Sequence, residues 1–362
     1  MKHEAVIAIP GVPNKVTEGI ASFKNELSGA PGIIDVAACM EVPSREIRDS
    51  GPVLVEGVNM DPARAPIVDI QVIDHDLVPL LGLEFVAGHN IAPANSDLMA
   101  PEFNETYTLQ DYLIGKPREY LINETAMRLL GWQSAEDAIG QRISWSIGDF
   151  ALASGPIRGV VKDFHQETLK NKVDPVIMVN EPIWLRTILV KVSTDRLQAS
   201  VQQMQTAWDK LFPHYPMEYH FLDELYENLY KGERVQLQLL FIFSGLAIAI
   251  AFMGLLGLIT YALKTRMKEF AVRKVLGASL TDLVRMMSRE YLMILLIGSI
   301  IAVPLSIYSV SEWLSEFAYH VDITPASYVI AVSLVMLLLL CTISLQTLKT
   351  SRVNPADTLR DE

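Results

Sequence analysis

Three long stretches without a charged residue, all in the last third of the chain, constrain the fold most. They cover residues 237–263, 291–310 and 326–348, and none contains Asp, Glu, Lys or Arg. A helix needs about 20 residues to cross the hydrocarbon core of a bilayer, and each stretch is long enough. One such stretch could be a buried helix of a soluble protein. Three in succession predict a membrane region of three helices over residues 237–362.

The distribution of charge predicts how this region is oriented. Residues 264–290 hold seven Lys and Arg against three Asp and Glu, whereas residues 311–325 hold three acidic residues and no basic one. Basic residues accumulate on the cytoplasmic side of membrane proteins. We therefore expect residues 264–290 and the C-terminus in the cytoplasm. Residues 1–236, with 20 basic and 33 acidic residues, are then extracytoplasmic.

The region before the first apolar stretch alternates short strand-like and helix-like segments. Runs rich in β-branched residues, bounded by Pro, Gly or Asp, predict strands at residues 4–11, 33–42, 52–60, 65–73, 156–164, 175–180 and 187–192. Apolar residues at helical spacing predict helices at 16–27, 124–132 and 195–212, with starts at Asn123 and Thr194. The alternation predicts an α+β extracytoplasmic domain over residues 1–221.

Residues 222–236 predict an amphipathic stalk helix between this domain and the membrane. Leucines and tyrosines recur there every three or four residues, and no Pro separates the segment from the first apolar stretch. A continuous helix over residues 222–263 would be about 60 Å long. The alternative is an interfacial helix followed by a separate span.

Catalytic and metal-binding motifs are absent from the sequence. It contains no phosphate-binding loop, zinc-binding helix or nucleophile elbow. Asp74-His75-Asp76 and Asp163-Phe164-His165 are the best candidate metal ligands, but neither has further ligands at helical spacing. Cys39 and Cys341 predict no disulfide framework. We expect a chain without enzyme activity, cofactor or metal, and the acidic large domain argues against nucleic-acid binding.

The dodecamer KEFAVRKVLGAS, residues 268–279, follows the first apolar stretch and predicts a short amphipathic helix at the membrane surface. Glu269 and Arg273 have the spacing of a helical ion pair. Gly277 suits the left-handed conformation that ends a helix, and Ser279 with Asp282 resembles a capping box for the next one. The pattern alone leaves two interpretations open, a docking element for a partner protein or a basic helix resting on anionic lipid.

Small residues in the first apolar stretch predict close helix packing. Residues four apart on a membrane helix, when small, let two backbones approach. The candidates for packing between two copies of the chain are Gly245, Ala249, Gly254 and Gly257.

Several segments resemble the MacB/FtsX-type permeases of ABC transporters. KEFAVRKVLGAS is similar to that family's E-x-x-x-R-[KR]-x-[LI]-G-A-[ST] segment, and SRVNPADTLRDE at residues 351–362 resembles its closing motif. Similar segments of the extracytoplasmic domain are LGLEFVAGHNI, YLINETAMRLLGW, EDAIGQRI and GVVKDFHQETLKNKVDPVIM, and FLDELYENLYKGE resembles the entry to the stalk. The family has four spans, so we expect a first transmembrane helix that this chain lacks.

The resemblance implies a non-catalytic permease subunit in a bacterial inner membrane. It would act as a dimer with a separate ABC ATPase, in contact with lipid and other envelope components, and would export a substrate or transmit movement to its extracytoplasmic domain. The residues implied to bind the ATPase are Glu269, Phe270, Val272, Arg273, Lys274, Leu276, Gly277, Ala278 and Ser279. One alternative is a membrane-anchored binding or sensor module without an ATPase. The other is a membrane-bound hydrolase, against which the absence of a recognisable catalytic set argues.

Overall fold

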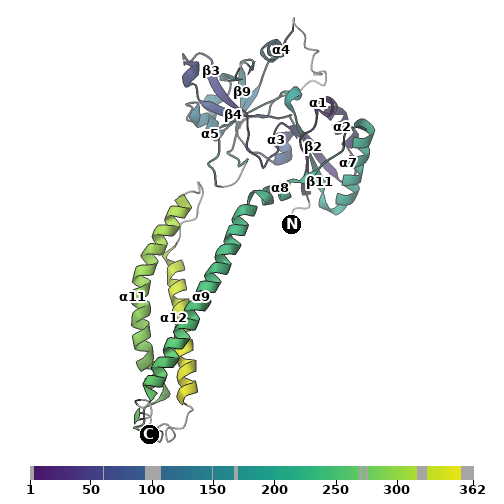
Figure 1. Cartoon of the computed structure of the whole chain (residues 1–362). Helices are drawn as coiled ribbons and strands as arrows, with labels where there is room; N and C mark the ends of the chain where they lie inside the picture. The colour runs from purple at the N-terminus through teal and green to yellow at the C-terminus, as the bar shows by residue number, and fades with distance from the viewer. Residues whose placement is uncertain are drawn as a thin grey trace. The chain divides into compact units, whose positions relative to one another are not determined.

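The computed structural model describes residues 4–59, 61–93, 107–148, 150–166, 170–267, 269, 272–273, 276–315 and 324–351 (Figure 1). The chain divides into two compact units, residues 1–231 and 232–362. The first is a mixed α/β domain, and the second consists of long helices.

A four-stranded antiparallel sheet is formed by the two ends of the first unit. Its order is β12-β1-β11-β2, and the register of the central pair places Ile7 opposite Val190. The strands are β1 (Glu4–Ile9), β2 (Ile33–Cys39), β11 (Thr187–Ser193) and β12 (His220–Phe221). The helices α2 (Ile20–Leu27) and α7 (Leu197–Leu211) pack against β2 and β11.

Large aromatic residues fill the space between this sheet and its helices. The rings of Phe23 and Trp208 meet edge to face with centroids 5.5 Å apart, and Phe212 packs on Trp208 at 4.9 Å. A Cβ at Gly19 would lie 2.5 Å from the Phe212 ring. Gly19 therefore leaves room for Phe212, and it divides the helix predicted over 16–27 into α1 (Asn14–Thr17) and α2.

The chain between β2 and β11 forms an eight-stranded mixed sheet, in the order β5-β9-β6-β10-β4-β3-β7-β8. Strand β9 also pairs with β7, so the six strands from β9 to β7 close into a ring. The strands are β3 (Ser50–Val55), β4 (Ile67–Val72), β5 (Phe85–Gly88), β6 (Tyr120–Asn123), β7 (Arg142–Ile147), β8 (Phe150–Ala151), β9 (Gly155–Val161) and β10 (Val176–Val179).

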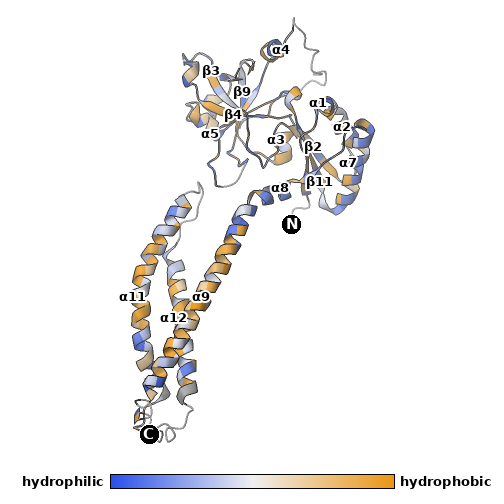
Figure 2. Ribbon diagram, viewed as in Figure 1, coloured by the Kyte–Doolittle hydropathy of each residue, from blue (hydrophilic) through white to orange (hydrophobic). Residues whose placement is uncertain are grey.

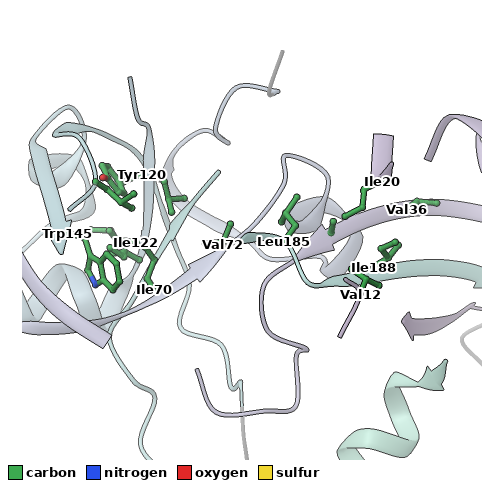
Figure 3. Close-up of a cluster of buried hydrophobic side chains, with 14 of the residues drawn as sticks. Val12, Ile20, Val36, Ile70, Val72, Tyr120, Ile122, Trp145, Leu185 and Ile188 are labelled. Carbon is green, nitrogen blue, oxygen red and sulfur yellow. The ribbon is translucent and has the colours of Figure 1, made fainter. Parts of the chain in front are cut away.

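Alternation along β4 shows how these strands build the core. Val68, Ile70 and Val72 point to one face, because successive side chains of a strand alternate, and all three join the larger buried cluster. Trp145 packs there and donates its Nε1 hydrogen to the carbonyl of Val68 at 3.1 Å. Figure 3 shows Tyr120, Ile122, Ile70 and Trp145 together, with Val72 between them and the side chains of the four-stranded sheet.

Short helices and turns connect the strands of the first unit. Asn123 caps α5 by accepting a hydrogen bond from the backbone of Ala126, as predicted. The helix predicted to start at Thr194 begins later, because residues Thr194–Arg196 first form a tighter 3-10 turn that no side chain caps. The elements are α3 (Leu77–Leu81), α4 (Leu109–Gly115), α5 (Glu124–Leu129), α6 (Ala135–Ala138), η1 (Pro62–Arg64), η2 (Pro182–Trp184) and η3 (Thr194–Arg196).

The prediction of one continuous helix over residues 222–263 is wrong, because the helix is interrupted at Tyr230. Helix α8 (Leu222–Leu229) ends at Tyr230, whose φ of −95° and ψ of 11° depart from helical values, and α9 (Lys231–Thr265) starts at the next residue. Leu222 is buried in the second cluster of the first unit, and Leu225 and Tyr226 pack against that cluster. The core contacts of α8 therefore fix it to the α/β unit, and the predicted stalk over 222–236 spans two helices.

The second unit contains α9, α11 (Leu280–Ser315) and α12 (Pro325–Ser351). Their apolar residues are coloured orange on the ribbon in Figure 2. Each contains a segment long and apolar enough to cross a membrane, namely Lys231–Thr265, Val284–Ser315 and Pro325–Leu348. The three long apolar helices predicted from the sequence are confirmed.

Candidate partner-docking segment

The candidate site is the connection between α9 and α11, residues 266–279, together with the helix ends that hold it. Arg266 follows the end of α9 and forms a forked ion pair with Glu290 of α11, with nitrogen–oxygen distances of 2.9 and 3.2 Å. Such a planar two-bond contact fixes orientation as well as distance. The sequence analysis did not predict this pair. The available signal was that Arg266 follows the apolar stretch 237–263 and Glu290 precedes the stretch 291–310.

A helical ion pair follows, as predicted. A guanidinium nitrogen of Arg273 lies 2.7 Å from a carboxylate oxygen of Glu269, four residues earlier. Both side chains are about half exposed, so the pair contributes at most about 1 kcal/mol to stability. Its charged groups remain accessible to a partner.

The chain then turns sharply at Gly277. The φ of Gly277 is +90°, in the left-handed region that side chains disfavour. The backbone N–H of Ala278 donates to the carbonyl of Arg273 at 2.9 Å, which is the long hydrogen bond of a Schellman motif. A Cβ at Gly277 would meet no atom within 4 Å. Glycine is therefore required here by the left-handed backbone conformation and not by lack of space for a side chain. The predicted helix end and turn at Gly277 are confirmed.

A capping box begins α11 directly after the corner. The backbone N–H of Ser279 donates to the Asp282 carboxylate at 3.0 Å, and the N–H of Asp282 donates to the Ser279 hydroxyl oxygen at 3.3 Å. This reciprocal pair confirms the predicted helix start. The hydrogen bond from the Ser279 hydroxyl also lowers the pKa of Asp282.

Two apolar side chains of the segment are exposed on one helical face. Val272 is 50% exposed and Leu276 is 81% exposed. The N–H of Leu276 donates to the carbonyl of Val272 at 3.0 Å, so both side chains lie on the same face, one turn apart. Gly277 and Ser279 are exposed and Ala278 is partly buried. The predicted contacts Phe270 and Lys274 lie outside the described residues.

The small residues of α9 make no close contacts within the described part of the chain. A Cβ at Gly245, Gly254 or Gly257 would meet no atom within 4 Å, and Ala249 is exposed. Packing between copies of the chain stays a prediction for these four positions.

The candidate metal ligands have structural partners instead. Lys24 Nζ lies 2.8 Å from Asp74 and also contacts Asp76, while Asp74 accepts the backbone N–H of Ala38 at 2.7 Å. Asp163 accepts the N–H of Thr125 at 2.8 Å near the start of α5. No group of three His, Cys, Asp or Glu residues suited to a metal occurs among the described residues.

Comparisons with known proteins agree with this organisation of the membrane region. Residues 241–355, about a third of the chain, match the family described as FtsX-like permease C-terminal. The match confirms the predicted resemblance to FtsX-type permeases over these residues. No curated protein sequence matches the chain.

Three solved structures are similar to the first unit at low identity. The periplasmic region of MacB from Actinobacillus actinomycetemcomitans is 12% identical, with 64% of this chain and 94% of that chain covered and a TM-score of 0.39. The extracellular domain of the noncanonic ABC-type transporter YknZ from Gram-positive bacteria is 13% identical, with coverages of 60% and 98% and a TM-score of 0.35. A domain of a putative permease from Porphyromonas gingivalis is 13% identical, with coverages of 60% and 88% and a TM-score of 0.35.

Proposed function

We propose that this chain, which carries an FtsX-like permease C-terminal domain at residues 241–355, is the permease subunit of a bacterial ABC transporter of the MacB/FtsX type. It couples ATP hydrolysis by a separate ATPase to movement of its extracytoplasmic domain, for export or for transmission of force. The observation that carries this proposal is Leu276, a leucine 81% exposed beside a rigid glycine corner.

Burial energy and geometry both favour a protein partner for this leucine. Covering an exposed leucine side chain contributes about 1.5–3 kcal/mol. The corner is held on one side by the Arg273–Ala278 backbone bond and on the other by the Ser279–Asp282 capping box. Leu276 is therefore presented with little loss of backbone freedom on binding, which favours affinity. Arg273 and Glu269 beside it supply charges for orientation.

The proposed topology follows from charge and helix length. The excess of basic residues at 264–290 supports a cytoplasmic location for the docking segment and the C-terminus and an extracytoplasmic one for residues 1–236. Helix α9 has 35 residues and is about 52 Å long, well over the roughly 30 Å of hydrocarbon. Its excess length extends beyond the hydrocarbon and carries movement toward the first unit. Two copies would meet along the small residues Gly245, Ala249, Gly254 and Gly257.

The test is purification of the tagged full-length protein in mild detergent, with mass spectrometry of the retained proteins. We expect a stoichiometric ATPase with a phosphate-binding loop, lost with Leu276→Asp and kept with Leu276→Met. Leu129→Asp is the matched control, because Leu129 is also an exposed helical leucine but lies in the first unit.

Coupling is then measured with the recovered ATPase. Leu276→Asp should abolish any nucleotide-dependent change in the first unit while the variant still inserts into the membrane. Normal coupling in that variant would refute docking through Leu276. Repeated absence of an ATPase from the native preparation would instead favour the membrane-anchored binding or sensor module.

A further inference from the structure

A groove between α11 and α12 is not used by the proposed docking segment. It has a volume of about 870 Å³ and is bordered by residues 281–296 of α11 and residues 340–348 of α12. Its walls are mainly apolar side chains, including Leu292, Met293, Leu296 and Leu340. The groove lies entirely within the second unit, so its shape does not depend on how the two units are placed.

One end of the groove is cationic and polar. Arg285 and Arg289 line it on successive turns of α11, with Ser288 between them. Neither arginine has a carboxylate within 4 Å among the residues that the structure describes, although Arg285 lies close enough to Asp282 to help lower the pKa of that carboxyl group. The Ser288 side chain is only 4% exposed, and its hydroxyl has no hydrogen-bond partner in the same part of the chain. Buried hydroxyl groups are normally hydrogen-bonded. Among the described residues, Ser288 therefore lacks a hydrogen-bonding partner at this end of the groove, and Arg289 lacks a carboxylate partner.

The length of the groove corresponds to one leaflet of a bilayer. Residues 281–296 of a helix extend over about 22 Å. A bilayer including its headgroups is about 40–45 Å thick, so one leaflet is roughly half of that. The arginines lie toward the end of α11 where the membrane segment begins at Val284, which is the level of lipid headgroups. The apolar walls then lie at the level of acyl chains.

We propose that this groove binds one anionic phospholipid. Its phosphate lies between Arg285 and Arg289, and an acyl chain follows Leu292, Met293 and Leu296 toward the centre of the membrane. A neutral apolar helix in the same place would leave the Arg289 guanidinium without a counter-charge and that of Arg285 with only the more distant Asp282 carboxylate, which is unfavourable in a low-dielectric site. This inference requires α11 and α12 to lie in a membrane. It does not require an ATPase or the proposed coupling.

The test uses tryptophan quenching in vesicles that contain the full-length protein. Met293 is 56% exposed at the groove, and Met293→Trp places a reporter there in a background carrying Trp313→Phe. Vesicles of phosphatidylcholine contain either brominated phosphatidylglycerol or brominated phosphatidylcholine at equal fractions. We expect preferential quenching by the anionic lipid, roughly fivefold in relative binding constant for each arginine. The preference should disappear in Arg285→Gln/Arg289→Gln and persist in Arg285→Lys/Arg289→Lys.

Ile301→Trp is the control, because Ile301 is 65% exposed on α11 but does not border the groove. Both brominated lipids should quench it equally. Equal quenching of Met293→Trp by the two lipids would show that the groove contacts only ordinary annular lipid, without preference for an anionic headgroup. That result would overturn the proposal. Absence of quenching at Met293→Trp, with normal quenching at Ile301→Trp, would mean that protein covers the groove and would also overturn it. Native mass spectrometry of the unsubstituted chain and its arginine variants checks the result without the tryptophan reporter.

Discussion

Replacing Arg118 with methionine should destabilise the first unit strongly, because it leaves a buried carboxylate without its main partner. Arg118 contacts Glu181 through its guanidinium, and the two side chains are 1% and 0% exposed. Glu181 also accepts hydrogen bonds from the Tyr112 hydroxyl at 3.1 Å and the Ile183 N–H at 3.4 Å. Methionine has a similar length, so the cavity stays small and the loss is mainly electrostatic.

The expected loss follows from what remains around Glu181. Removing one member of a buried ion pair typically costs about 3–5 kcal/mol. Lys116 Nζ lies 3.8 Å from the Glu181 carboxylate and stays close to it in the variant. We therefore expect the lower end of the range, about 3 kcal/mol. For a unit of this size each kcal/mol lowers the melting temperature by about 2–4 °C, so the shift should be about 6–12 °C.

The assay is thermal unfolding of the full chain in detergent, followed by tryptophan fluorescence. Four of the five tryptophans, Trp132, Trp145, Trp184 and Trp208, lie in the first unit. Arg142→Met is the control: Arg142 pairs with Glu56 at 2.7 Å, but both are about half exposed. An exposed pair contributes about 0–1 kcal/mol, so its melting temperature should hardly change.

A double-mutant cycle with Glu181→Gln decides whether the pair itself matters. If Arg118 and Glu181 stabilise the fold through each other, Arg118→Met/Glu181→Gln should lose clearly less than the sum of the single losses, by about 1–3 kcal/mol. Additive losses would refute the electrostatic reasoning. They would attribute the effects to packing of each side chain alone.

Two further predictions concern titratable groups of the first unit. Partial burial would raise the pKa of Glu119, but hydrogen bonds from the Ala92 N–H and from Arg158 outweigh it and hold the pKa below its ordinary value of 4.5. The native chain should therefore be more stable than Arg158→Gln by the full amount above pH 4.5. This stability difference should disappear as the pH falls through the lowered pKa of Glu119. Melting temperatures measured against pH test the prediction, and a difference that persists in acid would contradict it. Burial raises the pKa of the Cys39 thiol, which is fully enclosed. In a Cys341→Ser variant, N-ethylmaleimide should therefore label Cys39 only after denaturation. Labelling of the folded protein at neutral pH would show that the core opens.

Local signals in the sequence predicted the elements whose stability is local. The capping residues Asn123 and Ser279 and the corner glycine Gly277 were identified correctly, because each acts through bonds within a few residues. The three apolar helices were also predicted, since their length and composition alone determine them. The docking contacts and the packing of small helix residues stay predictions, because they concern partners outside the chain.

Long-range pairings were not predictable in the same way. The closure of six strands through the β7–β9 pairing depends on register between segments that no local pattern links. Arg118 and Glu181 read as ordinary surface charges in the sequence, because their burial appears only when α4, β6 and β10 come together. The break at Tyr230 lacks a Pro signal and comes before Gly232. It reflects the different surroundings of the residues on either side: Leu222, Leu225 and Tyr226 pack on the first unit, whereas the residues after Tyr230 are mostly exposed.

The packing of the second unit bears on how the proposed coupling would operate. Over most of their length its helices have exposed apolar side chains, as expected for surfaces that contact lipid. One buried cluster joins all three helices, through Ile259 and Leu263 of α9, Met287 of α11, and Leu339 and Ile343 of α12. The Arg266–Glu290 pair lies within a turn of this cluster along both α9 and α11. The docking segment is therefore attached to the one place where the described parts of the three helices are packed together. A displacement imposed at Gly277 would act on α9 and α11 through these contacts at once. A segment tied to α11 alone would leave α9, the helix that directly follows the first unit in the chain, free to stay in place.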